Sequence, residues 1–373
     1  MVCDRCEESR ERGYSFCPGC GNPLNEGCLY CAQYERDGYE YCGKCGRHLG
    51  EHRQPASSET CVRSPNPLKM GTLFSTVFIV LALVAELGAM FYFFGEGLDW
   101  IGENGSTFFL LLPSIVKVCT FTGASAQAYF VLIAAAIIAS FIVLMYQSLP
   151  AMKPRSDIDT SKFERTPLYG IALLFGSVII IEFVINLIMA AIGSPLEIPE
   201  WIDEMSMGES IFEYAEAAVI EEIASRIVII GVPMALLALC YGKRDFLKNL
   251  LGGFGMSRVA LILLIASSIV FAVAHMGSWG IAKVFPTIVG GLAMGWLYIE
   301  YGVHASIMYH FLTDYLGVLV MVNDVLAASL LLIILVAGLV CLIELGKKTV
   351  DGVRRIKDLP ICGFETGSEE KED

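Results

Sequence analysis

The sequence predicts an all-α polytopic membrane protein with about eight transmembrane helices, preceded by a small N-terminal region of two zinc ribbons. Of the 373 residues, 55% are hydrophobic and only 17% are charged, and the mean hydropathy is +0.60. Soluble domains carry about 25% charged residues, so this balance indicates a membrane protein. Eight of the thirteen cysteines lie within the first 45 residues, and apolar sequence begins only at about Met70. The chain therefore divides into a cysteine-rich head and a membrane part.

The head, residues 1–50, contains four CxxC knuckles, and the second pair of knuckles repeats the first. The segment GYSFCPGCGNPL (13–24) aligns with GYEYCGKCGRHL (38–49), with glycine, aromatic, cysteine and leucine positions in register. Each unit offers four thiolates, the set that tetrahedral Zn²⁺ requires, and is too small to have a core of its own. We therefore expect two structural zinc ions, with the following ligands: Cys3, Cys6, Cys17, Cys20, Cys28, Cys31, Cys42 and Cys45. A disulfide scaffold is the alternative, and it would need an oxidising compartment.

The partners of the head follow from its charge. Acidic residues outnumber basic ones by ten to seven in residues 1–60, and the formal net charge of the chain is −13. This balance argues against nucleic acid, so we expect the ribbons to bind a protein partner. Residues 51–69 are polar and contain three prolines, which predicts a flexible linker.

The membrane part is predicted to span residues 70–346, followed by a cytoplasmic tail at 347–373. The stretch 108–119 is short and contains Pro113 and Lys117, so we interpret it as interfacial or re-entrant. Eight other apolar runs are long enough to cross a bilayer. They lie at roughly 71–94, 125–147, 168–193, 211–241, 259–278, 283–301, 304–322 and 325–345.

The distribution of basic residues predicts the orientation. The loops 148–167 and 242–258 each hold four Lys or Arg, whereas 194–210 holds none and is acidic. An even number of spans with both termini in the cytoplasm satisfies this asymmetry. It also leaves the zinc ribbons in a reducing compartment. We therefore expect an integral protein of the cell membrane.

The segment EEIASR (221–226) places three charged residues within the predicted span 211–241, where apolar residues are expected. Glu222 and Arg226 are spaced i, i+4, so they share a helix face and can neutralise each other. Glu221 is rotated by about 100° from Glu222 and lacks that partner. A carboxylate removed from water becomes a better proton acceptor, which makes Glu221 a candidate general base.

Further polar residues lie on two later spans. His275 is near the end of the fifth span, and His310 and Asp314 share a face of the seventh. Left unpaired in hydrocarbon, such groups cost several kcal/mol each, so we expect them to meet Glu221 in one site. Glu86 and Glu182, single acids within the first and third spans, are either functional or paired with a polar neighbour.

The order of the motifs EExxxR, FxxxH and HxxxD resembles that of the CPBP family. This family comprises the CAAX-processing and bacteriocin-processing (Abi) intramembrane proteases, and it includes the type II CAAX prenyl endopeptidases. The marked core covers residues 221–314, and the zinc ribbons lie outside it. The residues that carry the resemblance are Glu221, Glu222, Arg226, Phe271, His275, His310 and Asp314.

The resemblance implies an intramembrane endopeptidase that cleaves a membrane-associated peptide or protein, prenylated ones included. Glu221 and His275 would activate a water, while His310 and Asp314 would stabilise the oxyanion. The family often has asparagine at the last position, and an ionised aspartate can only accept a hydrogen bond. Asp314 would therefore be protonated, orient His310, or help to bind a metal. Two histidines and a glutamate also form a set of ligands for catalytic zinc, so the sequence leaves open whether the enzyme is a metalloprotease.

The remaining motif residues, Glu222, Arg226 and Phe271, would shape the site. Two other functions stay open. Intramembrane Glu and His residues also form relays in proton-coupled transporters, which would predict inverted repeats that we do not find in the sequence. A non-catalytic membrane scaffold could use the zinc ribbons to bind its partner. Convergence of the polar side chains in a water-accessible cavity would favour the enzyme.

Overall fold

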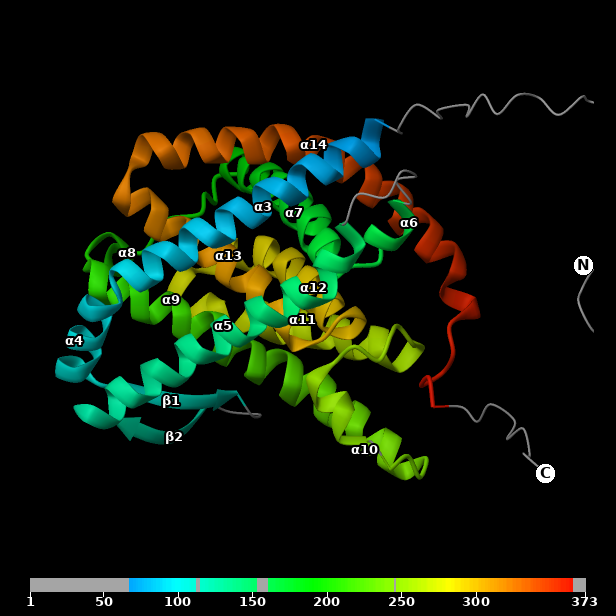
Figure 1. Ribbon diagram of the computed structural model, residues 1–373, viewed down its shortest axis with the longest axis horizontal. Helices are drawn as coiled ribbons and strands as arrows, with labels where there is room; N and C mark the ends of the chain where they lie inside the picture. Colours follow the sequence, from blue (N-terminus) through cyan, green and yellow to red (C-terminus); the bar gives the residue numbers. More distant parts are fainter. Residues whose placement is uncertain (1–66, 112–114, 153–159, 245, 365–373) are drawn as a thin grey trace, which may run out of the picture. The chain divides into compact units, whose positions relative to one another are not determined.

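The computed structural model describes residues 67–111, 115–152, 160–244 and 246–364. The eight predicted zinc ligands, and the predicted linker up to residue 66, lie outside the described residues and stay predictions. The described chain is mainly helical (Figure 1).

Eight helices in the described residues are long and apolar enough to cross a membrane, which confirms the predicted number of spans. Three of them begin at a Ser or Thr whose side chain accepts a hydrogen bond from the first turn of the helix: Thr166, Ser206 and Ser257. The spans are α3 (Pro67–Tyr92), α5 (Ala124–Met152), α7 (Pro167–Ala191), a continuous rod of α9 (Met207–Glu222), η1 (Ile223–Gly231) and α10 (Val232–Cys240), then α11 (Arg258–Trp279), α12 (Val284–Glu300), α13 (Val303–Val322) and α14 (Asp324–Arg355).

Shorter elements connect the spans. A hairpin of β1 (Ser106–Leu111) and β2 (Ile115–Phe121) replaces the interfacial or re-entrant segment predicted at 108–119. The sequence there is rich in aromatic and β-branched residues, which favour strands. The other short elements are α4 (Phe94–Asn104), α6 (Thr160–Phe163), α8 (Glu200–Asp203), η2 (Phe246–Leu251), η3 (Ile281–Lys283) and η4 (Ile356–Asp358).

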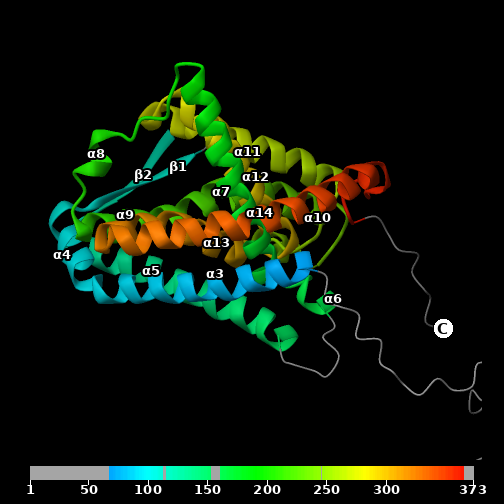
Figure 2. The same ribbon diagram turned by 90° about the horizontal axis from the view of Figure 1, so that it is seen from above.

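The central helix of the bundle is α13, which contacts α3, α5, α7, α9, α12 and α14 (Figures 1 and 2). A run of its residues, from Ala305 to Leu312, is buried, His310 among them. The surrounding helices therefore exclude lipid from this part of α13, and polar side chains there can meet groups from neighbouring spans.

The π-helix η1 interrupts the rod that begins with α9. Pro233 follows it and has no amide hydrogen, so the carbonyl of Ile229 has no i+4 partner in an α-helical register. Within η1 the carbonyl of Ile227 accepts the amide of Val232 in the i+5 register, and π turns often lie at functional sites. Here η1 begins directly after Glu221 and Glu222.

The end of the described chain folds back on α11. The helix α14 continues to Arg355, past residue 347, where the tail was predicted to begin. After η4, the carbonyls of Pro360 and Ile361 accept the amides of Arg258 and Val259, each at 3.0 Å. These bonds satisfy backbone donors at the start of the helix that carries His275.

Candidate active site

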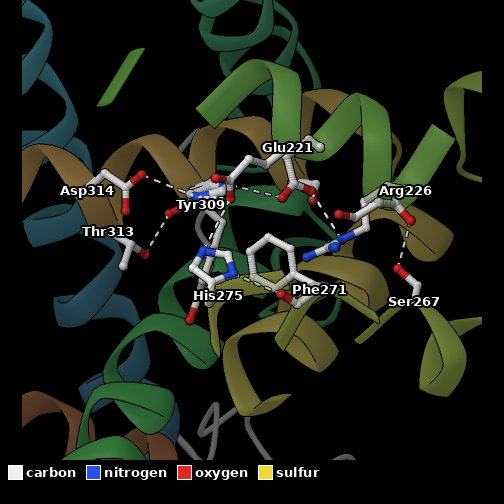
Figure 3. A network of polar contacts seen from close by, with 12 residues as sticks. Glu221, Arg226, Ser267, Phe271, His275, Tyr309, Thr313 and Asp314 are labelled. Carbon is white, nitrogen blue, oxygen red and sulfur yellow. Dashed lines mark hydrogen bonds and ion pairs between the residues drawn. The ribbon is translucent and has the colours of Figure 1, made fainter. Parts of the chain in front are cut away.

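Three helices bring the predicted polar residues together inside the bundle (Figure 3). The Oε2 atom of Glu221, from the end of α9, lies 3.7 Å from His275 Nε2 on α11 and 3.7 Å from His310 Nε2 on α13. The Oδ2 atom of Asp314 lies 3.3 Å from the same nitrogen of His310. The four residues selected from separate motifs therefore form one cluster.

Glu221 itself has an unusual environment. Its side chain is 34% exposed, yet its Oε2 atom is buried and has no hydrogen-bond partner among the described residues. A separation of 3.7 Å is too long for a direct hydrogen bond to either imidazole. The oxygen is thus an unused acceptor that faces two ring nitrogens.

Glu222, its neighbour, is fully buried and fully engaged. Its Oε1 atom lies 3.0 Å from His310 Nδ1, and its Oε2 atom lies 3.3 Å from Arg226 Nε. The hydroxyl of Ser306 also donates a hydrogen bond to Oε2. Sequence reasoning missed Ser306, although it lies one helical turn before His310 and on the same face of α13.

Arg226 is also fully buried. Its guanidinium carbon lies 4.7 Å from the centre of the Phe271 ring, which supplies a cation–π contact. No described residue accepts a hydrogen bond from its three side-chain nitrogens, so the ion pair with Glu222 and the ring of Phe271 are its stabilising contacts. Removal of either contact would leave a poorly compensated charge within the bundle.

His275 is oriented by the backbone of its own helix. Its Nδ1 atom lies 2.8 Å from the carbonyl oxygen of Phe271, which can only accept a hydrogen bond. The proton therefore belongs on Nδ1, and in the neutral ring Nε2 keeps a lone pair directed towards Glu221. The ring of Phe271 also packs against both imidazoles, with centroid distances of 4.7 Å to His275 and 6.0 Å to His310.

A cavity of about 140 Å³ adjoins this cluster. Its volume holds several water molecules. The lining residues include His275, His310 and Asp314 from the cluster, together with Phe271, Tyr309, Thr313, Glu182, Asn186, Lys283 and Thr287. Glu182, one of the two acids left open by the sequence, thus lies at the site, and Lys283 is a second charge there that sequence reasoning missed.

Glu86, the other acid left open, is fully buried in α3. Neither of its carboxylate oxygens has a hydrogen-bond partner among the described residues. It is not a lining residue of the cavity.

The cluster contains donors of the kind that bind zinc, namely two histidines and carboxylates. Both histidines make the second hydrogen bond that is typical of a zinc ligand, through Nδ1 to a carbonyl or a carboxylate. Among the described residues, however, no group of three or more His, Cys, Asp or Glu side chains is spaced to hold a metal ion. A catalytic zinc ion at this cluster therefore stays a prediction.

The fold and the cluster define a class: a polytopic membrane protein with glutamate and histidine side chains gathered around a cavity inside its helices. Residues 206–316 match the family model of the Rce1-like type II CAAX prenyl endopeptidases, so this part of the chain is an Rce1-like domain. The match includes all three motifs and confirms the family predicted from them. It covers less than a third of the chain and excludes the cysteine-rich head.

The comparison with curated proteins finds no match, and neither does the comparison with solved structures. The Rce1-like proteins are a peptidase family, and their domain lies here within apolar membrane-spanning helices. This favours a protease over the transporter and the scaffold.

Proposed function

We propose that the chain is an intramembrane endopeptidase that hydrolyses a peptide bond of a membrane-associated substrate, prenylated peptides included. The observation that carries this proposal is the buried Oε2 atom of Glu221, which has no hydrogen-bond partner among the described residues and lies 3.7 Å from two imidazole nitrogens. Polar atoms at such a separation are commonly joined by a water molecule.

Glu221 and His275 would activate this water. The water donates one hydrogen bond to Glu221 Oε2 and the other to the lone pair on His275 Nε2, which leaves an oxygen lone pair free for attack. As the water oxygen forms a bond to the peptide carbonyl carbon, Glu221 takes the proton, and it passes this proton to the nitrogen when the C–N bond breaks. A carboxyl group and an amine are the products, and general-base help of this kind contributes about 10²–10⁴-fold in rate.

His310 would stabilise the charge that develops on the carbonyl oxygen. Its two ring nitrogens face carboxylates, Glu222 at Nδ1 and both Glu221 and Asp314 at Nε2. A ring protonated on both nitrogens satisfies these contacts. Its Nε2–H group can then also donate a hydrogen bond to an oxyanion placed beside it, a stabilisation that is often the largest catalytic term.

Asp314 is then a positioning residue. An ionised carboxylate cannot donate a hydrogen bond to an oxyanion, but it can hold His310 through Nε2 at 3.3 Å. Of the three roles that the sequence left open for Asp314, orientation of His310 has the support of this contact. Glu222, Arg226 and Phe271 hold the two imidazoles in place.

The test uses the full chain in lipid vesicles with a farnesylated peptide and with a peptide anchored by an acyl chain. We expect at least one to be cleaved, and mass spectrometry in H₂¹⁸O should find one ¹⁸O atom in the new carboxyl group. His275→Gln should lower the rate by about 10²–10⁴-fold. The matched control is His304→Gln, because His304 lies outside the cluster and contacts Gln147 at 3.0 Å. Absence of any product from the unmodified chain would favour the scaffold.

A further inference from the structure

We propose that the hydroxyl of Tyr309 binds the substrate by donating a hydrogen bond to a peptide carbonyl next to the cleaved bond. This role rests on the proposed function and adds a substrate-binding residue to it. Tyr309 precedes His310 in α13, and both line the cavity together with His275 (Figure 3). Tyr309 belongs to none of the three sequence motifs.

Three hydroxyl groups line the cavity in the described part of the chain, and two of them are already engaged. Thr287 donates to the carbonyl of Lys283 at 2.7 Å, and Thr313 donates to the carbonyl of Tyr309 at 3.0 Å. The hydroxyl of Tyr309 makes no hydrogen bond with any described residue. Among these three groups, Tyr309 is therefore the one whose proton is available to a ligand.

The packing of Tyr309 holds its hydroxyl in one place. The residue is only 2% exposed, and its ring meets that of Phe175 on α7 edge to face, with centroids 5.8 Å apart. It lies on α13, the central helix of the bundle, directly before His310. A carbonyl bound by Tyr309 would therefore place the peptide at a set position relative to the cluster, as positioning of a reacting bond requires.

Acceptors on the cavity wall complement the other half of a peptide group. The carboxylates of Glu182 and Asp314 line the cavity, and so does Asn186, whose buried Oδ1 atom has no hydrogen-bond partner among the described residues. These groups suit the amide hydrogens of a peptide backbone, whereas its carbonyls need donors. A carbonyl left unpaired away from water is unfavourable, and the hydroxyl of Tyr309 can pair it.

Replacement of Tyr309 by Phe tests this hydrogen bond, because it keeps the ring and its contact with Phe175. For a lipid-anchored peptide that the unmodified chain cleaves, Tyr309→Phe should lower kcat/KM roughly 5- to 100-fold, the loss expected when a carbonyl remains unpaired in the complex. The loss should appear mainly as a higher KM, since the bond is present in the bound substrate as well as in the transition state.

The thermal midpoint of Tyr309→Phe should not change, because the hydroxyl bonds to no described residue. The matched control is Tyr301→Phe. Tyr301 is not a lining residue of the cavity, and its ring packs against Trp296 with centroids 5.7 Å apart. This control should keep the kcat/KM of the unmodified protein.

Modified peptides identify the carbonyl. In each of two further peptides, sulfur replaces the carbonyl oxygen of the peptide bond before or after the cleaved one, and sulfur accepts hydrogen bonds only weakly. With the unmodified chain, one of the two peptides should lose kcat/KM by a factor similar to that of Tyr309→Phe. Tyr309→Phe should cleave this peptide as fast as its parent, because the bond that sulfur weakens is already absent.

Failure of this role differs from failure of the proposed function. Equal kcat/KM for Tyr309→Phe and the unmodified protein would overturn the role of Tyr309 and leave the protease intact. Losses that multiply for both sulfur peptides would do the same. If the unmodified chain cleaves no peptide, the protease proposal fails. Binding of the parent peptide, measured by fluorescence anisotropy, then decides the role of Tyr309, since equal affinity in Tyr309→Phe and the unmodified chain overturns it.

Discussion

Glu221 and Glu222 are adjacent in the chain but differ in every contact that matters for chemistry. Glu222 is bound to Arg226, His310 and Ser306, whereas the buried oxygen of Glu221 has no hydrogen-bond partner in the described part of the chain. A rotation of about 100° per helical residue separates the two side chains. One carboxylate therefore supports the site, while the other is free to accept a proton.

Replacement of Glu222 tests the supporting role. Glu222→Gln leaves Arg226 buried without its counter-charge, which should destabilise the fold by about 3–5 kcal/mol. We expect a lower thermal midpoint or lower expression, with some turnover left in the protein that folds. The control is Glu204→Gln, because Glu204 is an exposed acid before α9. A midpoint equal to that of the unmodified protein would contradict the role assigned to Glu222.

Much of the cluster could be predicted from residue spacing. The i, i+4 relations within each motif predicted the Glu222–Arg226 ion pair and the shared face of His310 and Asp314, and both contacts are present. Contacts of Glu222 with His310 and Ser306 could not be predicted, because they depend on how α9 packs on α13. The position of Lys283 at the cavity could not be predicted either, because Lys283 follows a predicted loop and belongs to none of the three motifs.

At the scale of elements, the spans were predictable because hydropathy and length determine them. The π-helix η1 was not, since the predicted helix 211–241 has no signal for a change of register except Pro233. The β1–β2 hairpin was missed because the short length of 108–119, with Pro113 and Lys117, indicated an interfacial or re-entrant segment. Strand propensity was the available signal there.

Close packing of α7 against α14 depends on glycine. A Cβ atom built on Gly176 would lie 2.9 Å from the Cα atom of Gly338, and one on Gly338 would lie 2.9 Å from the carbonyl carbon of Gly176. The two backbones therefore touch, as at other membrane interfaces lined by small residues.

Gly338→Ala should force the two helices apart and lower the thermal midpoint. The matched control is Gly346→Ala in the same helix, where a Cβ atom would meet nothing within 4 Å. Alanine there should be neutral or should stabilise the helix by up to about 1 kcal/mol. The account of this interface is wrong if both variants have the midpoint of the unmodified protein.

At the scale of the whole molecule, the charges of the described residues divide between the two ends of the bundle. The end with α4, α8 and the start of α14 is acidic, and the end with α6 and the last turns of α10 and α14 is basic (Figures 1 and 2). By the positive-inside rule, we propose that the basic end faces the cytoplasm. The cavity, lined by Leu196 and Lys283, is then closer to the opposite side.

Epitope tags test this orientation. A tag inserted after Gly193, in the connection between α7 and α8, should be accessible to antibody on intact cells. A tag at the C-terminus should become accessible only after permeabilisation. The reverse pattern would show that the orientation is inverted.

Zinc analysis of the purified full chain tests the cysteine-rich head. It should find two zinc ions per chain, the number expected for two ribbons with four cysteine ligands each.

The most direct test of the account is the cleavage rate of Glu221→Gln. Glutamine keeps the volume and polarity of the side chain but cannot take a proton from water, so we expect the rate to fall by about 10²–10⁴-fold. The thermal midpoint should change little, because the buried oxygen of Glu221 makes no hydrogen bond within the described chain. Cleavage by Glu221→Gln at the rate of the unmodified protein would contradict the central claim that Glu221 activates the water.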